Sequence, residues 1–509
     1  MLNSEQKSVS ADAVMSHTYI ACDLGAESGR VILGVLQSGI LTLEEIHRFS
    51  NAPVRSGDSL HWDVHHIFEE LKTGFSRVAK HHKGAGAVSL SVDSWGVDYV
   101  LVNRAHVPLT LPYHYRDRRT DEVFRTAFET VPAEVVFAET GIQFMPINTL
   151  YQLLAHQQQA PMELVQSDQL LLIADFLHAL FCGVGVAERS LASTTQLYNP
   201  ATRQWSKELL SRFDLPVALL PPLVDPGTAL GPLLPEIAAE TGLPAEVQVI
   251  ATCSHDTAEA VVAVPEEGDD WAFLSSGTWS LLGVELPEPL INAEVQAANF
   301  TNEIGYGGTV RFLKNIAGLW IIQECRRDWL AAGTECSYEE LTALAGSAEP
   351  FRSLIYPAAA RFLKSGDMAG RVIQFCRDAG QPPPLTPGQM VRCALESLAL
   401  SYRATLEQIE ALTGRTIHRL HIVGGGSQSV LLNQFAANAT GRKVLAGPVE
   451  ATAIGNLLLQ AVTLGHLETI ADLRRTVRAS FPIELFAPAD ADVWQDAYAR
   501  FQHMETLNP

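Results

Sequence analysis

The feature that most constrains this chain is an order of strands, turn and helix that occurs twice along it. In the first copy, residues 18–36 predict two apolar strands joined by a glycine-containing turn at 24–30. A third strand is expected over 41–49, a helix around 64–81 and a buried strand over 87–92. The chain therefore opens with three antiparallel strands, which are followed by a helix and a further strand.

The second copy begins past the middle of the chain. Two strands are expected within 271–286, separated by the turn Ser-Ser-Gly-Thr at 275–278. A helix over 387–412 and a strand over 418–423 follow, and this strand leads into the glycine turn 424–426. We interpret the repetition as two domains of like design, with room for a ligand between them.

Composition excludes several classes of partner. Lys plus Arg is 36 and Asp plus Glu is 57, which gives a net charge of −21 that repels nucleic acid and anionic lipid. No apolar run approaches the roughly 18 residues that span a bilayer. Residues 1–17 lack the apolar core of a signal peptide, and we expect them to form a flexible extension of a cytoplasmic protein. The expected partners are small molecules, for a monomer or a small homo-oligomer.

Common nucleotide-binding motifs are missing. No lysine follows a glycine, which excludes a Walker A loop, and no G-x-G-x-x-G opens a helix after a strand, which disfavours a Rossmann dehydrogenase. Backbone N–H groups of the turn at 26–30 could hold phosphate, with Asp23 binding magnesium directly or through water. A tight hairpin accounts for Gly25 and Gly29 equally well.

Asp256 has two interpretations. Asp256 to Glu259, placed before the apolar run 260–264, predicts a helix N-cap with a capping-box glutamate. The carboxylate could also act as a general base, because a helix N-terminus favours its ionised form. Ser254, His255 and Thr257 beside it could hydrogen-bond a polyol, so the two roles are compatible.

The order of motifs resembles the FGGY family of carbohydrate kinases. The resemblance covers the chain from Tyr19 to about Phe501. Its most specific segments are DLGAESGR (23–30), DSWGVDYVL (93–101), YRDRRT (115–120), INTLYQL (147–153), SHDTAEAV (254–261), SSGTWSLLG (275–283), FLKNIAGLWIIQECRRDW (312–329) and HIVGGGSQSVLLNQ (421–434).

The resemblance implies an α/β fold of two ribonuclease-H-like domains, of actin and hexokinase type, flanking a catalytic cleft. Residues 18–264 would form the sugar-binding N-terminal domain. Residues 265–509 would form the nucleotide-binding C-terminal domain, which ends in a helical tail. In that tail Val493, Trp494, Tyr498 and Phe501 have helical spacing and are expected to pack in the core.

The resemblance also implies roles for individual residues. Asp256 would be the catalytic base, and the sugar would contact Gly96, His255, Asp256 and Thr257. ATP would contact Ala26, Glu27, Ser28, Gly29, Arg30, Thr278, Asn315, Gln323 and Gly425. Glu27 stands where a small residue such as serine is usual, and an acid disfavours triphosphate, so only its backbone N–H is assigned to phosphate.

The implied reaction is the transfer of the γ-phosphoryl group of ATP, with Mg²⁺, to the C1 hydroxyl of L-rhamnulose. The products would be L-rhamnulose 1-phosphate and ADP, in L-rhamnose catabolism. Two alternatives stay open. One is a related kinase acting on another ketose or polyol, such as L-fuculose or xylulose, and the other is a non-catalytic ATP-binding member of the superfold.

Overall fold

The computed structural model describes residues 16–507 apart from 82–85, 363 and 365. Most of the predicted N-terminal extension lies outside the described residues. Its last two residues, Ser16 and His17, belong to strand β1 (Ser16–Leu24), so the prediction is wrong for them. In the described part of the chain, no helix combines the length and the apolar composition needed to cross a membrane.

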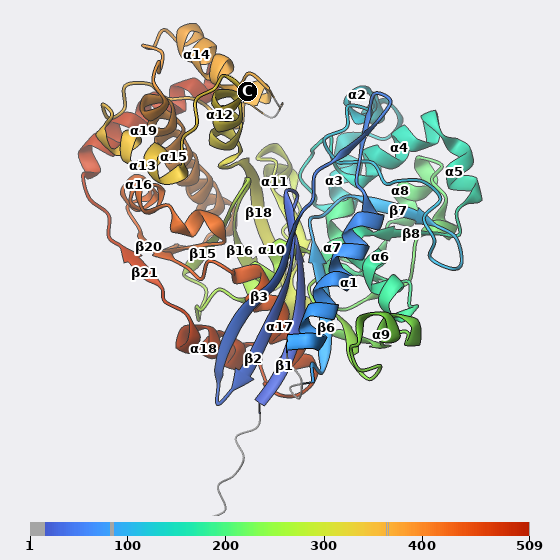
Figure 1. Cartoon of the computed structure of the whole chain (residues 1–509). Helices are drawn as coiled ribbons and strands as arrows, with labels where there is room; N and C mark the ends of the chain where they lie inside the picture. The colour runs from blue at the N-terminus through green and yellow to red at the C-terminus, as the bar shows by residue number, and fades with distance from the viewer. Residues whose placement is uncertain (1–15, 82–85, 363, 365, 508–509) are drawn as a thin grey trace, which may run out of the picture.

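The first half is built on a six-stranded sheet with the order β13-β14-β6-β1-β2-β3. Strand β1 pairs antiparallel with β2 and parallel with β6, and β2 pairs antiparallel with β3. The new strands are β2 (Ser28–Gln37), β3 (Ile40–Ser50), β6 (Ser89–Ser94), β13 (Thr228–Pro232) and β14 (Gln248–Ala251). Helix α1 (Val64–His81) follows the three-stranded opening and packs along this sheet (Figure 1).

The second half is built on a seven-stranded sheet with the order β17-β18-β16-β15-β19-β20-β21. Strand β15 pairs antiparallel with β16 and parallel with β19, while β16 pairs antiparallel with β18. The strands are β15 (Trp271–Ser276), β16 (Trp279–Leu286), β17 (Thr301–Ile304), β18 (Val310–Ala317), β19 (Arg419–Val423), β20 (Lys443–Ala446) and β21 (Glu484–Phe486).

The two sheets share one topology. The order β14-β6-β1-β2-β3 in the first half corresponds to β20-β19-β15-β16-β18 in the second, with the same parallel and antiparallel pairings. Helix α1 joins β3 to β6 in the first half, and α15 (Pro387–Thr413) precedes β19 in the second. The repetition predicted from the sequence is therefore confirmed, and so is the mixed α/β fold.

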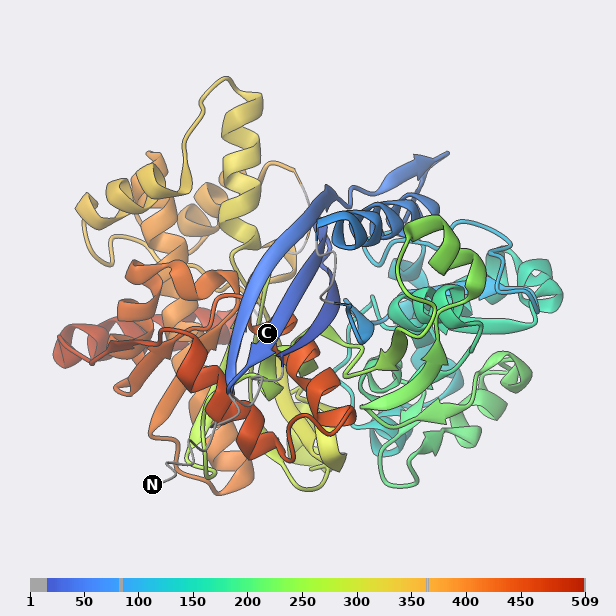
Figure 2. The same cartoon turned by 60° about the horizontal axis from the view of Figure 1, so that its bottom comes forward.

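Further elements surround each sheet, as Figures 1 and 2 show. In the first half these are β4 (Val54–Ser56), β5 (Ser59–His61), β7 (Tyr99–Val102), α2 (Thr120–Thr130), α3 (Ala133–Thr140), α4 (Thr149–Gln159), α5 (Pro161–Gln166), β8 (Gln169–Leu172), α6 (Ile173–Cys182), β9 (Ala187–Glu188), α7 (Arg189–Ala192), β10 (Tyr198–Asn199), β11 (Gln204–Trp205), α8 (Lys207–Arg212), β12 (Leu223–Val224) and α9 (Pro235–Thr241). In the second half they are α11 (Ala293–Ala297), α12 (Trp320–Ala331), α13 (Tyr338–Ser347), α14 (Met368–Asp378), α16 (Val430–Thr440), α18 (Ile470–Ser480) and α19 (Ala491–Leu507).

Two helices pack against each other where the halves meet. Helix α10 (Asp256–Val262) closes the first half, and α17 (Ala451–Thr463) comes from the second. Their apolar side chains join those of β1 and β15 in one buried cluster. The crossing is close, because a Cβ on Gly455 would lie 2.1 Å from the carbonyl oxygen of Glu259. This contact fixes the start of α10, and with it Asp256, against the second half.

The predicted C-terminal tail forms helix α19. Trp494, Tyr498 and Phe501 are buried in the core of the second half, as their spacing predicts. Val493 is 52% exposed, so its predicted place in the core is wrong. It neighbours Trp494 in sequence, and adjacent residues on a helix do not share a face.

Candidate active site

A cavity of about 320 Å³ lies where the two halves meet. Its walls are the turn between β1 and β2, the segment after β6, the start of α10, the turn between β15 and β16, and the glycine turn after β19. Eight of the residues singled out from the sequence line it: Ala26, Gly96, His255, Asp256, Thr257, Thr278, Asn315 and Gly425. The fold thus gathers motifs from the whole length of the chain around one space.

Asp256 is the first residue of α10, and His255 holds the N-cap position. No side chain caps this helix, so the predicted N-cap at Asp256 and its capping box are wrong. Glu259 is fully buried one turn along the helix, and it makes no hydrogen bond to the N-cap backbone. The Asp256 Oδ1 atom instead accepts hydrogen bonds from the backbone N–H and, at 3.1 Å, the hydroxyl of Thr257.

The surroundings of Asp256 set its proton affinity. Its side chain keeps 31% exposure at the cavity wall, while the protein around it excludes most water. This burial raises the pKa of Asp256 to about 7, and the charge of Asp23 adds to the rise. Hydrogen bonds from Thr257 and the charge of Arg311 lower the pKa by less. Burial therefore outweighs the helix N-terminus, and the group can take up and release a proton near neutral pH.

Gly96 has a steric reason to be glycine. A Cβ at this position would lie 2.8 to 3.0 Å from the side-chain atoms of Thr194. The next residue, Val97, donates its backbone N–H to the Thr194 hydroxyl at 3.1 Å. The segment after β6 thus passes close to Thr194 and presents its backbone to the cavity.

The wall that the second half contributes combines two turns that lack charged side chains. Gly277 and Gly425 would each carry a Cβ with no heavy atom within 4 Å, so their backbones border open space. Gly426 packs so tightly that a Cβ would lie 2.0 Å from the Ser276 hydroxyl oxygen. Asn315 lines the cavity but gives its side-chain N–H to the Oε1 atom of Gln143 in the first half, at 3.0 Å.

Six of the predicted residues do not line the cavity: Asp23, Glu27, Ser28, Gly29, Arg30 and Gln323. Arg30 hydrogen-bonds Asp23 and also pairs with Glu450 of the second half. Ser28 and Gly29 begin β2, where a Cβ on Gly29 would overlap the Phe49 ring at 2.2 Å.

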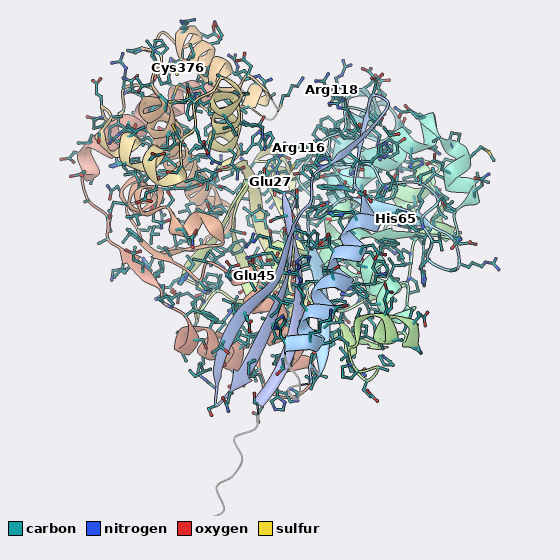
Figure 3. All side chains as sticks on the ribbon, viewed as in Figure 1. Glu27, Glu45, His65, Arg116, Arg118 and Cys376 are labelled. Carbon is teal, nitrogen blue, oxygen red and sulfur yellow. The ribbon has the colours of Figure 1, made fainter. Side chains whose placement is uncertain are left out.

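The other two lie near α12. Glu27 is exposed between the two halves, with its carboxylate 3.5 Å from the guanidinium of Arg327 (Figure 3). Gln323 stands on α12 itself. Its side-chain Oε1 is buried and accepts no hydrogen bond from a described residue.

Sequence reasoning missed Asp98, which shapes the cavity without lining it. Its carboxylate accepts hydrogen bonds from the indole N–H groups of Trp62 and Trp95, at 2.6 and 3.0 Å, and from Gln152 at 2.8 Å. Trp95 itself lines the cavity. Burial raises the pKa of Asp98 to about 6, so it is largely ionised at neutral pH. The sequence signal that could have identified Asp98 is its position as an acidic residue inside the otherwise apolar stretch 97–102.

Sequence reasoning also missed Arg116, which joins the two halves, and two residues of β17 at the cavity wall. Arg116 of the first half stacks on Trp320 of the second, with 3.9 Å from its Cζ to the ring centroid. Thr301 and Glu303 of β17 line the cavity and are buried. Arg116 lies in the segment 115–120 that carries the family resemblance, whereas β17 matches no segment that the sequence singled out.

Comparison with known proteins places this geometry in a family. The N-terminal and C-terminal domain models of the FGGY family of carbohydrate kinases match residues 18–263 and 272–464. A rhamnulokinase from Bacteroides thetaiotaomicron is 43% identical over 96% of this chain and 99% of its own length. One from Enterococcus faecalis is 40% identical over 97% of this chain and 99% of its own length.

The fold has counterparts among solved structures. The crystal structure of a gluconate kinase from Lactobacillus acidophilus superimposes with a TM-score of 0.80 at 15% identity, over 97% of this chain and 98% of that one. At this identity the likeness supports the fold alone. With both domain models matched along the chain and relatives of about 40% identity over nearly its full length, this chain belongs to the FGGY family of carbohydrate kinases.

Proposed function

We propose that this carbohydrate kinase transfers the γ-phosphoryl group of ATP to the C1 hydroxyl of L-rhamnulose. The products are L-rhamnulose 1-phosphate and ADP, in L-rhamnose catabolism. The choice of sugar rests on the two rhamnulokinases, which are 43% and 40% identical to this chain. Each match spans nearly all of this chain and nearly all of the rhamnulokinase. The observation that supports the chemistry is a carboxylate with a pKa near 7 at the wall of a cavity between the halves.

In this mechanism Asp256 is the general base. It accepts the proton of the C1 hydroxyl as the sugar oxygen bonds to the γ-phosphorus, and the bond from that phosphorus to the bridging oxygen of ADP breaks. Phosphoryl transfer passes through a loose transition state, so most of the acceleration comes from positioning. Gly96, His255 and Thr257 line the cavity together with Asp256 and would hold the ketose.

The two halves divide the substrates. Residues 18–264 hold the sugar, and residues 265–509 hold ATP through Thr278, Gly425, Asn315 and Gln323. From the first half, the hairpin turn between β1 and β2, of which Ala26 lines the cavity, would offer backbone N–H groups to the phosphates. The Arg30 guanidinium forms ion pairs with the carboxylates of Asp23 and Glu450 instead of facing the phosphates.

Mg²⁺ is expected with ATP, and Asp23 is the residue assigned to it. The described residues contain no group of three or more His, Cys, Asp or Glu side chains that could hold a metal on their own. Mg²⁺ is typically bound by one or two carboxylates together with substrate phosphates. When bound, the ion would neutralise charge on the transferring phosphoryl group.

A sugar panel tests the proposed substrate. ADP release is measured with L-rhamnulose, L-fuculose, xylulose and gluconate, and the highest kcat/KM is expected with L-rhamnulose. A higher value with another ketose or polyol would assign the chain to a related kinase. ATP binding without any sugar phosphate would indicate a non-catalytic member of the superfold.

The variant Asp256→Asn tests the proposed base. Its turnover should fall about 100- to 10,000-fold, because general-base help has this size. ATP affinity and thermal unfolding should stay close to those of the unchanged protein, which controls for folding. Turnover within a few-fold of normal would remove Asp256 from the mechanism.

We further propose a cytoplasmic enzyme that works as a monomer or small homo-oligomer. The net charge of −21 supports an absence of nucleic-acid and membrane partners. Light scattering coupled to size-exclusion chromatography measures the oligomeric state, and cell fractionation the location. Retention on heparin at physiological salt would contradict the assignment of small-molecule partners alone.

A further inference from the structure

A buried arginine of the second half reaches the candidate sugar site of the first. Arg311 of β18 has no exposed surface, and its Nη2 atom lies 3.0 Å from the Nδ1 atom of His255. Its Nε–H donates to the backbone oxygen of Ile304 at 3.2 Å, which fixes the direction of the guanidinium. The carboxylate of Glu303 lies 3.1 Å from the Nη1 atom.

This contact determines which nitrogen of His255 carries the proton. A guanidinium can only donate hydrogen bonds, so the Nδ1 atom of His255 must accept with its lone pair. In a neutral imidazole the proton then sits on Nε2. The Nε2 atom is on the side of Asp256, 3.5 Å from its Oδ1.

We propose that Arg311 is a positioning residue that fixes His255 as a neutral imidazole protonated at Nε2. The inference rests on the proposed kinase function and deepens it. His255 becomes a hydrogen-bond donor beside the general base and at the sugar subsite, and it does not compete with Asp256 for the proton of the acceptor hydroxyl. The residue responsible belongs to the half that is expected to hold ATP.

The groups around His255 keep it in this state. The charged groups that face it are Asp256 on α10, Glu303 on β17 and Arg311 on β18, at 3.5, 3.5 and 3.0 Å. Burial and then the charge of Arg311 hold the pKa of His255 well below its usual value, so it stays neutral. Glu303 compensates the charge of Arg311, which a buried guanidinium requires.

The backbone of His255 is held separately from its ring. The His255 backbone N–H donates to the Ser190 hydroxyl at 3.3 Å, and the Glu188 carboxylate accepts from the Ser254 backbone N–H at 2.9 Å. These bonds belong to the first half and do not involve Arg311. Changing Arg311 should therefore alter the protonation and orientation of the ring while the chain path around it is kept.

The first measurement is made on the unchanged protein. Nitrogen NMR of histidine-labelled protein should show one buried imidazole protonated at Nε2, assigned to His255 because the variant His255→Gln lacks the signal. The signal should not titrate between about pH 8 and pH 5.5. An Nδ1-protonated ring, or titration near the ordinary value of about 6.5, would overturn the proposal whichever sugar the enzyme accepts.

The second measurement uses variants. Arg311→Met should lower kcat/KM about 10- to 100-fold, the size typical of groups that orient a functional residue. It should also raise the pKa of His255, because the charge of Arg311 that lowers it is lost while burial remains. The NMR signal and the pH profile of kcat/KM should then show a protonation that the unchanged protein lacks. Arg311→Lys retains a hydrogen-bond donor. Its His255 NMR signal should again not titrate, and its kcat/KM should lie between those of Arg311→Met and the unchanged enzyme.

A matched variant separates positioning from packing. Arg442 is another largely buried arginine of the second half, with 14% exposure and an ion pair to Glu410, and it does not line the cavity. Arg442→Met should lower stability without altering the pH profile. If Arg311→Met keeps the pH profile of the unchanged enzyme, or if Arg442→Met changes it equally, the proposal fails. If Arg311→Met does not fold, the spectrum of the unchanged protein still decides.

Discussion

The two hairpin turns that border the cavity share one backbone plan but differ in charge. The first turn, between β1 and β2, is flanked by Asp23 and Arg30 and carries Glu27. The second turn, between β15 and β16, consists of Gly277 and Thr278 and follows Ser276, all of them uncharged. Both turns join topologically equivalent strands of the two sheets.

The difference shows that a duplicated turn can serve two purposes. Charges of the first turn tie the halves together, because Arg30 pairs with Glu450 and Glu27 with Arg327, both in the second half. The second turn is held by close packing, since Gly426 leaves no room for a Cβ beside Ser276. The first turn thus acts electrostatically on the cavity through Asp23, whereas the second forms a neutral and closely packed part of its wall.

The largest expected effect is on the pH dependence of catalysis. Burial, with a contribution from Asp23 of the first turn, raises the pKa of Asp256 to about 7 in the cavity. Only the ionised carboxylate can accept the proton, so kcat/KM should fall about tenfold per pH unit below pH 7 and level off above it. Initial rates at saturating ATP and low sugar measure this profile. This fall below pH 7, the acidic limb of the profile, should be absent from the residual rate of Asp256→Asn. An acidic limb that begins near pH 4 in the unchanged enzyme would contradict the raised pKa of Asp256.

The next largest effect is expected from Asp23→Asn, which removes the acid of the first turn. If Asp23 holds Mg²⁺ directly or through water, turnover should fall about 10- to 100-fold and need more Mg²⁺. The acidic limb should also move to lower pH, because the charge of Asp23 raises the pKa of Asp256. Magnesium titrations of the rate measure the first effect.

Glu45→Gln is the matched control for Asp23→Asn. Glu45 also faces Arg30, at 3.9 Å, but its side chain is 40% exposed against 10% for Asp23, and its charge is not among those that raise the pKa of Asp256. Its removal should leave the magnesium dependence and the acidic limb unchanged. An unaltered magnesium dependence in Asp23→Asn would remove the metal assignment, while a shifted acidic limb would still support the electrostatic role of the first turn.

A smaller effect is expected from the glycine turn beside the second hairpin. Gly426→Ala would place a Cβ 2.0 Å from the Ser276 hydroxyl oxygen and 2.9 Å from its backbone oxygen. The strain should lower the free energy of unfolding by about 1–3 kcal/mol, measured by urea denaturation. Gly425→Ala should leave the free energy of unfolding unchanged, because its Cβ meets no atom within 4 Å. Equal losses in the two variants would contradict the steric account of this wall.

Much of the fold could be predicted because its signals are local. Alternating strands, glycine turns and the long helix at 387–412 follow from short-range patterns, and their order revealed the repetition. The place of Asp256 at a helix start was also predictable, although its neighbour His255 takes the N-cap position. Glu259 was misassigned because tertiary burial, which no local pattern contains, draws its side chain into the core.

The remaining features of the site depend on contacts between distant parts of the chain. Arg30 was assigned to phosphate from its turn, yet its partner Glu450 stands more than four hundred residues away. Arg311 reaches His255 from β18, and Glu303 lies on a four-residue strand without an apolar pattern. Such side chains show their importance only once the two halves are brought together.

The smallest effect is expected from Glu27→Gln, which removes the outermost charge of the first turn. Its carboxylate is 53% exposed and lies 3.5 Å from the guanidinium of Arg327, itself 58% exposed. An ion pair of this kind contributes about 0–1 kcal/mol, so thermal unfolding should hardly change. ATP should bind up to a few-fold more tightly, because a negative charge near the triphosphate is lost. Calorimetric titration with ATP at low and high salt measures this gain, which should shrink as salt screens the charge. Weaker ATP binding would mean that Glu27 contributes to the nucleotide site through its side chain, which would break the division between a charged first turn and a neutral second one.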